Sequence, residues 1–199
     1  MNTTAKKIEN TVLSLHPFSE LNYERSYSID SLILMFFAFS GIGWIWEVIL
    51  HIIEDGMIIN RGVMTGPWLP IYGMGGVLIL VVLKKFRARP MQLFGTIMCL
   101  CGVIEYVTSI VLESLFGARW WDYSDMLLSI DGRVCLEGLM IFGIGGLFFI
   151  YIIAPKMDDL LMRFSSKSKI IVCVFLLAVF LGDLVHMFIA PNMGFGITS

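Results

Sequence analysis

The feature that most constrains this chain is a series of long apolar windows. Four of them run approximately 30–53, 91–115, 134–154 and 170–190. Each is close to the roughly 20 residues that a helix needs to cross a hydrocarbon core about 30 Å thick. Because 57% of the residues are hydrophobic and the mean hydropathy is +0.83, we infer an integral membrane protein.

A fifth window, residues 68–83, is shorter and begins inside "NRGVMTGPWLPIYGMGG", residues 60–76. Irregular backbone is tolerated at membrane depth only where protein or a water-filled cavity covers it, and transporters build binding sites at such broken helices. A tight turn with a structural ion pair for Arg61 is the other reading. The predicted fold is all-α, a polytopic transmembrane bundle of about five spans, whose short second span has a broken Pro/Gly-rich start.

The windows follow one another without a linker or a repeat, which indicates one transmembrane domain over residues 30–190. Residues 1–29 form a polar cytoplasmic segment without the apolar region of a cleaved signal, so we expect the first span to remain as an anchor. Within that segment Ile8, Val12 and Leu15 have helical spacing, which indicates either a short interfacial helix or a frayed terminus. Residues 191–199 form a short extracytoplasmic tail.

The basic residues predict the orientation. Eleven Lys and Arg fall in the N-terminal segment and in the 84–90 and 155–169 loops, whereas only Arg61, Arg119 and Arg133 fall on the other side. Cytoplasmic loops carry an excess of Lys and Arg. We therefore place the N-terminus in the cytoplasm and the C-terminus outside.

Several carboxylates lie inside or at the edge of the predicted spans, where an unpaired charge costs a few kcal/mol or more. All of them fall near the midplane or in the outer half: Glu47, Glu105, Glu113, Glu137 and Asp183. The outer loops and spans hold ten acids against three arginines, a formal −7. This imbalance predicts an acidic pocket that takes a cation or a proton, although burial could equally leave some of these carboxylates protonated and bonded to the backbone.

Two arginines stand close to these carboxylates in the predicted arrangement. Arg61 could reach Glu47 or Glu113, and Arg133 is four residues from Glu137, a spacing at which we expect it to neutralise that carboxylate. In the loop 119–133 the aspartates do not match the spacing of a calcium loop, and an aromatic belt with capping aspartates is the favoured interpretation. The four cysteines form no CxxC pair and are interpreted as packing residues. No cofactor is predicted, and a bound cation is left open.

Four ordered motifs carry a resemblance to a known family. They are "GWIWE" at 43–47, "NRGVMTGPWLPIYGMG" at 60–75, "EYVTSIVLESLFGARWWDYS" at 105–124 and "GRVCL" at 132–136. Together they resemble the bacterial putative ABC-transporter type IV family, also called CmpB-like, over roughly residues 35–155. Ser129 and Leu139 depart from the family's pattern, and the last span, with Asp183 and His186, lies outside the resembling region.

The resemblance implies a permease-like protein of the bacterial plasma membrane. Combined with the acidic outer half, it gives a predicted ligand-binding set of Glu47, Asn60, Arg61, Tyr72, Glu105, Glu113, Asp122 and Arg133. The expected partners are membrane lipid and a small solute or cation, with no nucleic acid. Because the chain lacks a GxxxxGK[ST] phosphate loop, any ATPase would be a separate subunit.

Two alternatives to a transporter stay open at this point. The protein could be a non-catalytic scaffold or partner subunit whose ion pairs fix helix packing. It could also be a membrane-embedded enzyme that acts on a lipid or envelope precursor with two carboxylates as acid and base. The sequence favours a protein that is not an enzyme, because it contains no HExxH, no GxSxG and no His-rich metal spacing.

Overall fold

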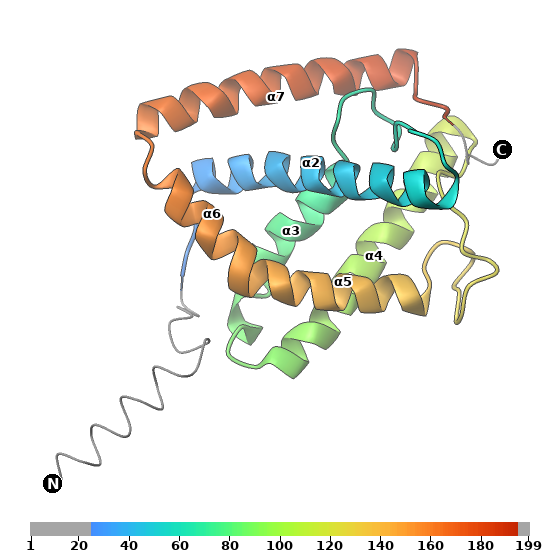
Figure 1. Cartoon of the computed structure of the whole chain (residues 1–199), viewed down its shortest axis with the longest axis horizontal. Coiled ribbons are helices and arrows are strands. Elements are labelled where there is room, and N and C mark those ends of the chain that lie inside the picture. Colours follow the sequence, from blue (N-terminus) through green and yellow to red (C-terminus); the bar gives the residue numbers. More distant parts are fainter. Residues whose placement is uncertain (1–24, 195–199) are drawn as a thin grey trace, which may run out of the picture.

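The computed structural model describes residues 25–194, and these form a bundle of helices (Figure 1). The helices are α2 (Ile29–Glu54), α3 (Pro70–Val82), α4 (Pro90–Phe116), α5 (Leu136–Phe148), α6 (Ala154–Leu161) and α7 (Ser166–Ile189), with a 3-10 turn, η1 (Lys84–Phe86), and a π-helical segment, η2 (Phe149–Ile153). Four helical stretches are long and apolar enough to cross a membrane, and α3 is shorter. The predicted fold class is confirmed. The predicted interfacial helix at Ile8, Val12 and Leu15 lies outside the described residues.

The helix boundaries follow from local sequence signals. Ser28 and Ser165 cap α2 and α7, each accepting a hydrogen bond from a main-chain N–H three residues on. Pro70 and Pro90 open α3 and α4, where a missing N–H removes no bond from the helix. Gly117, with a φ of 68°, ends α4 in the left-handed region.

The fourth apolar helix is longer than the sequence predicted. α5, η2 and α6 form one continuous stretch, Leu136–Leu161, whereas the prediction ended near residue 154. Pro155 cannot donate the main-chain bond that a regular α-helix requires, and the π-helical turn stands directly before it. Consequently the predicted 155–169 loop shrinks to residues 162–165, between α6 and α7.

Glycines bring α2 and α3 into close contact. A Cβ at Gly43 would lie 2.3 Å from Tyr72 Cγ, and one at Gly73 would lie 2.5 Å from the Phe36 carbonyl oxygen. Such small residues let membrane helices approach each other closely. The Leu69 N–H also donates to the Ser40 carbonyl at 2.9 Å, so α3 starts beside the middle of α2.

The position of this contact shows how the chain runs between the two helices. Ser40 precedes the end of α2, Glu54, by 14 residues, which is about 21 Å along the helix axis. Residues 55–69 therefore leave the end of α2 and fold back into the bundle before α3 begins. The broken start of the short second span is thus a segment of non-helical backbone whose last residue lies beside the middle of the apolar helix α2.

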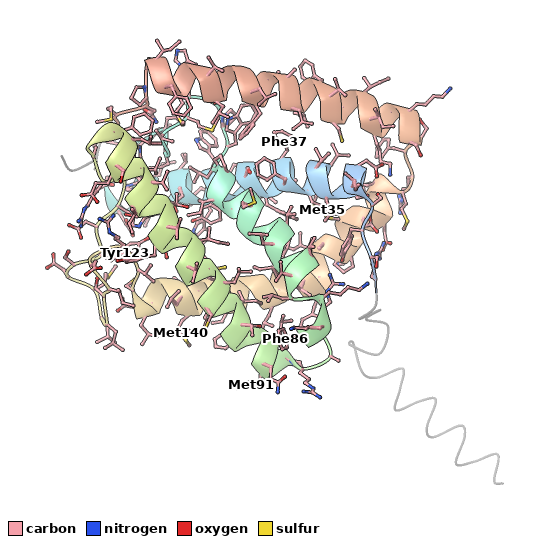
Figure 2. The ribbon with its side chains drawn as sticks, turned by 180° about the vertical axis from the view of Figure 1, so that it is seen from behind. Met35, Phe37, Phe86, Met91, Tyr123 and Met140 are labelled. Atoms are coloured by element: carbon pink, nitrogen blue, oxygen red, sulfur yellow. The ribbon has the colours of Figure 1, made fainter. Side chains whose placement is uncertain are left out.

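The bundle has two ends, which we name by their connections (Figure 1). The loop end contains residues 55–69, 117–135 and 190–194; the turn end contains residues 25–28, 83–89 and 162–165. In Figure 2 Tyr123 lies at the loop end, and Phe86 and Met91 lie at the turn end. The apolar core between them comes from α2, α3, α4 and η2, and includes Met35, Phe39, Leu80, Leu93, Ile97 and Ile150.

Candidate functional site

Glu47 on α2 lies between a tyrosine and an arginine. The Tyr72 hydroxyl, from α3, donates to Glu47 Oε1 at 2.6 Å. On the other side Arg61 Nε lies 3.7 Å from Glu47 Oε2, and the same guanidinium donates to the Trp120 carbonyl at 3.3 Å. Arg61 Nε is buried without a hydrogen-bond acceptor among the described residues. Of the two carboxylates that Arg61 could reach, it therefore pairs with Glu47, at more than hydrogen-bond distance.

Glu105 on α4 is the most deeply buried of these carboxylates, with 4% of the residue exposed. The Tyr123 hydroxyl donates to its Oε1 at 3.1 Å, whereas its Oε2 is buried without a hydrogen-bond donor in the described part of the chain. The pKa of Tyr123 is raised first by burial, then by the charge of Glu105 and the hydrogen bond to it, and also by the charge of Glu47. Both carboxylates thus act on one tyrosine.

These five residues form what we call the carboxylate–tyrosine cluster: Glu47, Arg61, Tyr72, Glu105 and Tyr123. They come from five different segments, namely α2, the 55–69 loop, α3, α4 and the 117–135 loop. The close approach at Gly43 sets the Tyr72 ring against α2, one turn before Glu47. The glycines of the first two spans therefore position the site as well as pack the helices.

Glu113, two turns further along α4, belongs to a separate ion-pair network. Arg119 Nε lies 3.1 Å from its Oε1, and Arg133 contacts its Oε2. Arg133 also donates to Ser109 Oγ at 2.7 Å. The predicted pairing of Arg133 with Glu137 is wrong, because α5 begins only at Leu136 and helical spacing does not apply between the two residues. Glu137 is exposed.

Asn60 holds the folded-back loop together. Its Oδ1 accepts from Trp44 Nε1 at 2.7 Å, and its Nδ2 donates to the Thr65 carbonyl at 2.9 Å. Asn192, beyond α7, donates to the Asn60 and Gly62 carbonyls at 2.8 Å each. The two side-chain hydrogen bonds of Asn60 therefore tie this loop to itself and to α2.

Asp183 on α7 anchors the same loop from the opposite side. It accepts hydrogen bonds from the Thr65 N–H at 3.2 Å, the Gly66 N–H at 2.9 Å and Trp68 Nε1 at 2.7 Å. His186, one turn along, lies 3.3 Å from Thr65 Oγ1. This role was missed from the sequence, although the free N–H groups of a non-helical segment at membrane depth call for such an acceptor.

Asp122 caps a turn within the 117–135 loop. It accepts from the Ser124 N–H at 3.0 Å and from Ser124 Oγ at 2.5 Å, and these bonds lower its pKa. Gly132 packs against it, since a Cβ there would lie 2.4 Å from Asp122 Oδ1. Asp131 instead accepts from the Tyr106 hydroxyl at 2.6 Å. In residues 25–194 no three His, Cys, Asp or Glu side chains meet in a way that could hold a metal ion.

The structure brings together half of the predicted ligand-binding set. Glu47, Arg61, Tyr72 and Glu105 meet in the carboxylate–tyrosine cluster. The other four lie elsewhere at the loop end, in the Glu113 network, the folded-back loop or the Asp122 turn: Asn60, Glu113, Asp122 and Arg133. Tyr123 was missed as a member, because its sequence neighbours Trp120 and Trp121 indicated a membrane-interface role for the whole stretch.

Comparison with known protein families identifies a family for most of the chain. A family model described as "Putative ABC-transporter type IV" matches residues 34–188. No curated protein and no solved structure matches the chain. The matched range includes Asp183 and His186, so the expectation that the last span lies outside the resembling region is wrong.

Proposed function

The chain belongs to the Putative ABC-transporter type IV family, and we propose that it is a permease-like membrane component that binds a small solute or cation at the carboxylate–tyrosine cluster. One observation carries this proposal. Glu105 is buried in the membrane-spanning part of α4, and one of its oxygens has no hydrogen-bond donor among the described residues. Buried polar groups are almost always bonded, so such an atom calls for a ligand or a proton.

The surroundings of Glu105 support a binding role. Residues 55–69 carry Arg61 to the cluster on non-helical backbone at membrane depth, an arrangement that transporters use at their substrate sites. Non-helical backbone is costly in lipid, and here the Asp183, Asn60 and Asn192 side chains hold it in place. A loop retained at this cost favours a function beyond connecting two helices.

Charge supports the same site. The cluster contains two carboxylates and one guanidinium, so it has one negative charge in excess. Elsewhere at the loop end Glu113 faces two arginines and Asp183 accepts three hydrogen bonds. Those two carboxylates suit the structural role that a scaffold requires, whereas Glu105 does not.

The wider setting of the proposal rests on the sequence. We place the protein in the bacterial plasma membrane with its N-terminus in the cytoplasm, because the basic loops favour that orientation. Any ATP-driven transport would need a separate ATPase subunit, since this chain has no phosphate loop. We also propose that the chain is not itself an enzyme.

A thermal-unfolding screen of the detergent-purified full chain tests the binding role. Cations, amines, small metabolites and lipid headgroups would be added to the parent and to Glu47→Gln, Arg61→Ala and Glu105→Gln. A ligand that binds the folded state raises the unfolding midpoint with its concentration. Glu137→Gln is the matched control, since it removes an exposed carboxylate at the start of α5.

The expected result is a compound that stabilises the parent and the control but not the three cluster variants. Stabilisation of all five proteins alike would place the binding site outside the cluster. If no compound stabilises the parent and all three cluster variants unfold early, the scaffold reading replaces the proposal. Turnover of an added lipid, lost in Glu47→Gln or Glu105→Gln, would instead establish the enzyme.

A further inference from the structure

Two buried atoms of the carboxylate–tyrosine cluster have no hydrogen-bond partner among the described residues, namely Arg61 Nε and Glu105 Oε2. Tyr72 satisfies Glu47 Oε1 and Tyr123 satisfies Glu105 Oε1. A tyrosine hydroxyl has a single hydrogen to donate, so neither tyrosine can serve a second oxygen. The two remaining oxygens are Glu47 Oε2, which is 3.7 Å from Arg61 Nε, and Glu105 Oε2, which has no donor in the described chain. Arg61 Nε–H faces Glu47 Oε2 across 3.7 Å, so each of these two atoms has a possible partner nearby, whereas Glu105 Oε2 is left without a donor.

The missing group must also carry one positive charge, because two carboxylates share a single guanidinium. A dehydrated divalent metal ion is a poor fit, since it takes several oxygen ligands and no group of three metal-binding side chains occurs in residues 25–194. A protonated amine fits better: it carries one charge and has N–H donors but no acceptor. It can donate to Glu105 Oε2, the buried carboxylate oxygen that has no donor among the described residues.

A proton can supply the same charge when no ammonium ion is bound. A proton on Glu105 Oε2 removes the excess negative charge from a site where an unpaired carboxylate is costly. Glu47 is less suited to this role, because its side chain is 24% exposed and faces Arg61. The ammonium ion and the proton would then compete for one oxygen.

We propose that the ligand of this site is a monovalent primary ammonium ion and that it exchanges for a proton on Glu105, an inference that rests on the proposed function. When the ammonium ion enters, the O–H bond of the Glu105 carboxyl breaks and its proton passes to water. The carboxylate then accepts an N–H hydrogen bond from the ligand. When the ligand leaves, a proton from water returns to the same oxygen, so charge and protons balance over the cycle.

The titratable and charged groups around Glu105 are compatible with this assignment. The groups that act on Glu105 or on its partner Tyr123 are Glu47 from α2, Tyr72 from α3, Cys101 on α4 itself, and Tyr123 and Cys135 from the 117–135 loop. Arg61 from the 55–69 loop faces Glu47. Tyrosine, cysteine and arginine ordinarily keep their protons at neutral pH. Glu105 is therefore the member of the cluster that we expect to gain and lose a proton.

The experiment uses the full chain in detergent with ethylammonium chloride as the probe. Titration calorimetry in two buffers of different ionisation heat counts the protons released on binding. Close to one proton per bound ion is expected at a pH where Glu105 is protonated, and the apparent affinity should rise roughly tenfold per pH unit over that range. Tetraethylammonium, which has the same charge and no N–H, should bind much more weakly.

Variants then assign the proton to one residue. Glu105→Gln should lose both ethylammonium binding and proton release, while Glu137→Gln should keep both. Binding of ethylammonium without proton release by the parent would overturn the exchange, as would unchanged affinity in Glu105→Gln. The parent measurement decides even if the variant fails to fold. The thermal-unfolding screen separates the two proposals. If a different solute stabilises the parent and calorimetry shows no proton release on its binding, the proposed binding function stands and the exchange is overturned. If no compound stabilises the parent, the binding function and the exchange are both overturned.

Discussion

The buried arginines at the two ends of the bundle differ in the lengths of their polar contacts. At the turn end Arg87 is 3% exposed and donates to two main-chain carbonyls, Arg25 O at 2.7 Å and Leu80 O at 2.6 Å. At the loop end the strongest contacts of Arg61 are longer, 3.3 Å to a carbonyl and 3.7 Å to Glu47. Arg87 closes the last turn of α3, whereas Arg61 stands beside a carboxylate with little direct bonding.

The carboxylates show the same contrast. Among the described residues of the turn end, Asp158 and Asp159 pair with Arg25, and Asp30 pairs with Lys169 at 2.5 Å. At the loop end Glu105 is more deeply buried than Asp159 or Asp30 and has no base of its own. Each of these three acids near the turn end thus has a basic partner, whereas Glu105 has none among the described residues.

The largest effect should come from Arg87→Ala. The change leaves the Leu80 and Arg25 carbonyls without their donors in a buried place, at a cost of about 3 kcal/mol of unfolding free energy. Arg61→Ala should cost about 1 kcal/mol, because its contacts are longer. Unfolding midpoints in detergent measure both, with the exposed Arg89→Ala as control. An equal or larger loss in Arg61→Ala would remove the contrast between the ends.

Next in size is Asp183→Ala, which removes three hydrogen bonds from the folded-back loop. We expect a loss of about 2 kcal/mol, with faster amide hydrogen exchange at Thr65 and Gly66 but not in α6. Asp159→Ala, at the exposed edge of the turn end, should cost less than about 1 kcal/mol. Unchanged exchange at Thr65 would show that the loop does not depend on α7.

The sequence predicts the helices of this fold well because their signals are local. Apolar windows place the spans, and the cluster of Gly and Pro in residues 60–76 marks the broken start of α3. These features depend on neighbours within a few residues. The π-helical turn before Pro155 is harder to predict, because a proline in this context can also end a helix.

Side-chain partners are less predictable because they depend on how distant segments meet. Asp183 bonds to Gly66 across 117 positions, and no spacing rule links them. Arg133 bonds to Glu113 on the preceding helix, although the nearer Glu137 looked like its partner. Half of the predicted ligand-binding set does meet around Glu47. These residues lie at similar positions along the predicted spans, and the presence of charged residues there was the signal that grouped them. Which of them have unsatisfied atoms required the structure.

A smaller effect should separate two buried carboxylates. Asp158→Asn weakens a pair in which Arg25 donates at 2.7 and 2.9 Å, and we expect a loss of about 1 kcal/mol. Glu105→Gln should leave the unfolding midpoint unchanged or raise it, because an amide removes an uncompensated charge and keeps the acceptor for Tyr123. Destabilisation of Glu105→Gln beyond that of Asp158→Asn would show that the Glu105 charge is structural.

The smallest effect concerns alkaline stability and compares a tyrosine at each end. Burial raises the pKa of both Tyr123 and Tyr27, but the charges of Glu105 and Glu47 raise it further at Tyr123, whereas those of Arg87 and Arg25 lower it at Tyr27. A pKa raised by folding gives stability that is fully present below the unfolded value, about 10, and is lost as the pH rises above it.

Unfolding midpoints from neutral pH to about pH 11 measure this difference. Tyr123→Phe should lose less stability than the parent above about pH 10, and Tyr27→Phe should resemble the parent more closely. At neutral pH Tyr123→Phe should cost about 1 kcal/mol or less, the worth of its hydrogen bond to Glu105. If Tyr27→Phe differed from the parent more than Tyr123→Phe does above about pH 10, the negative charge near Tyr123 would already be neutralised. The charges of Glu105 and Glu47 affect the pKa of Tyr123. The alkaline stability of the protein therefore reports the charge of the cluster without any ligand being added.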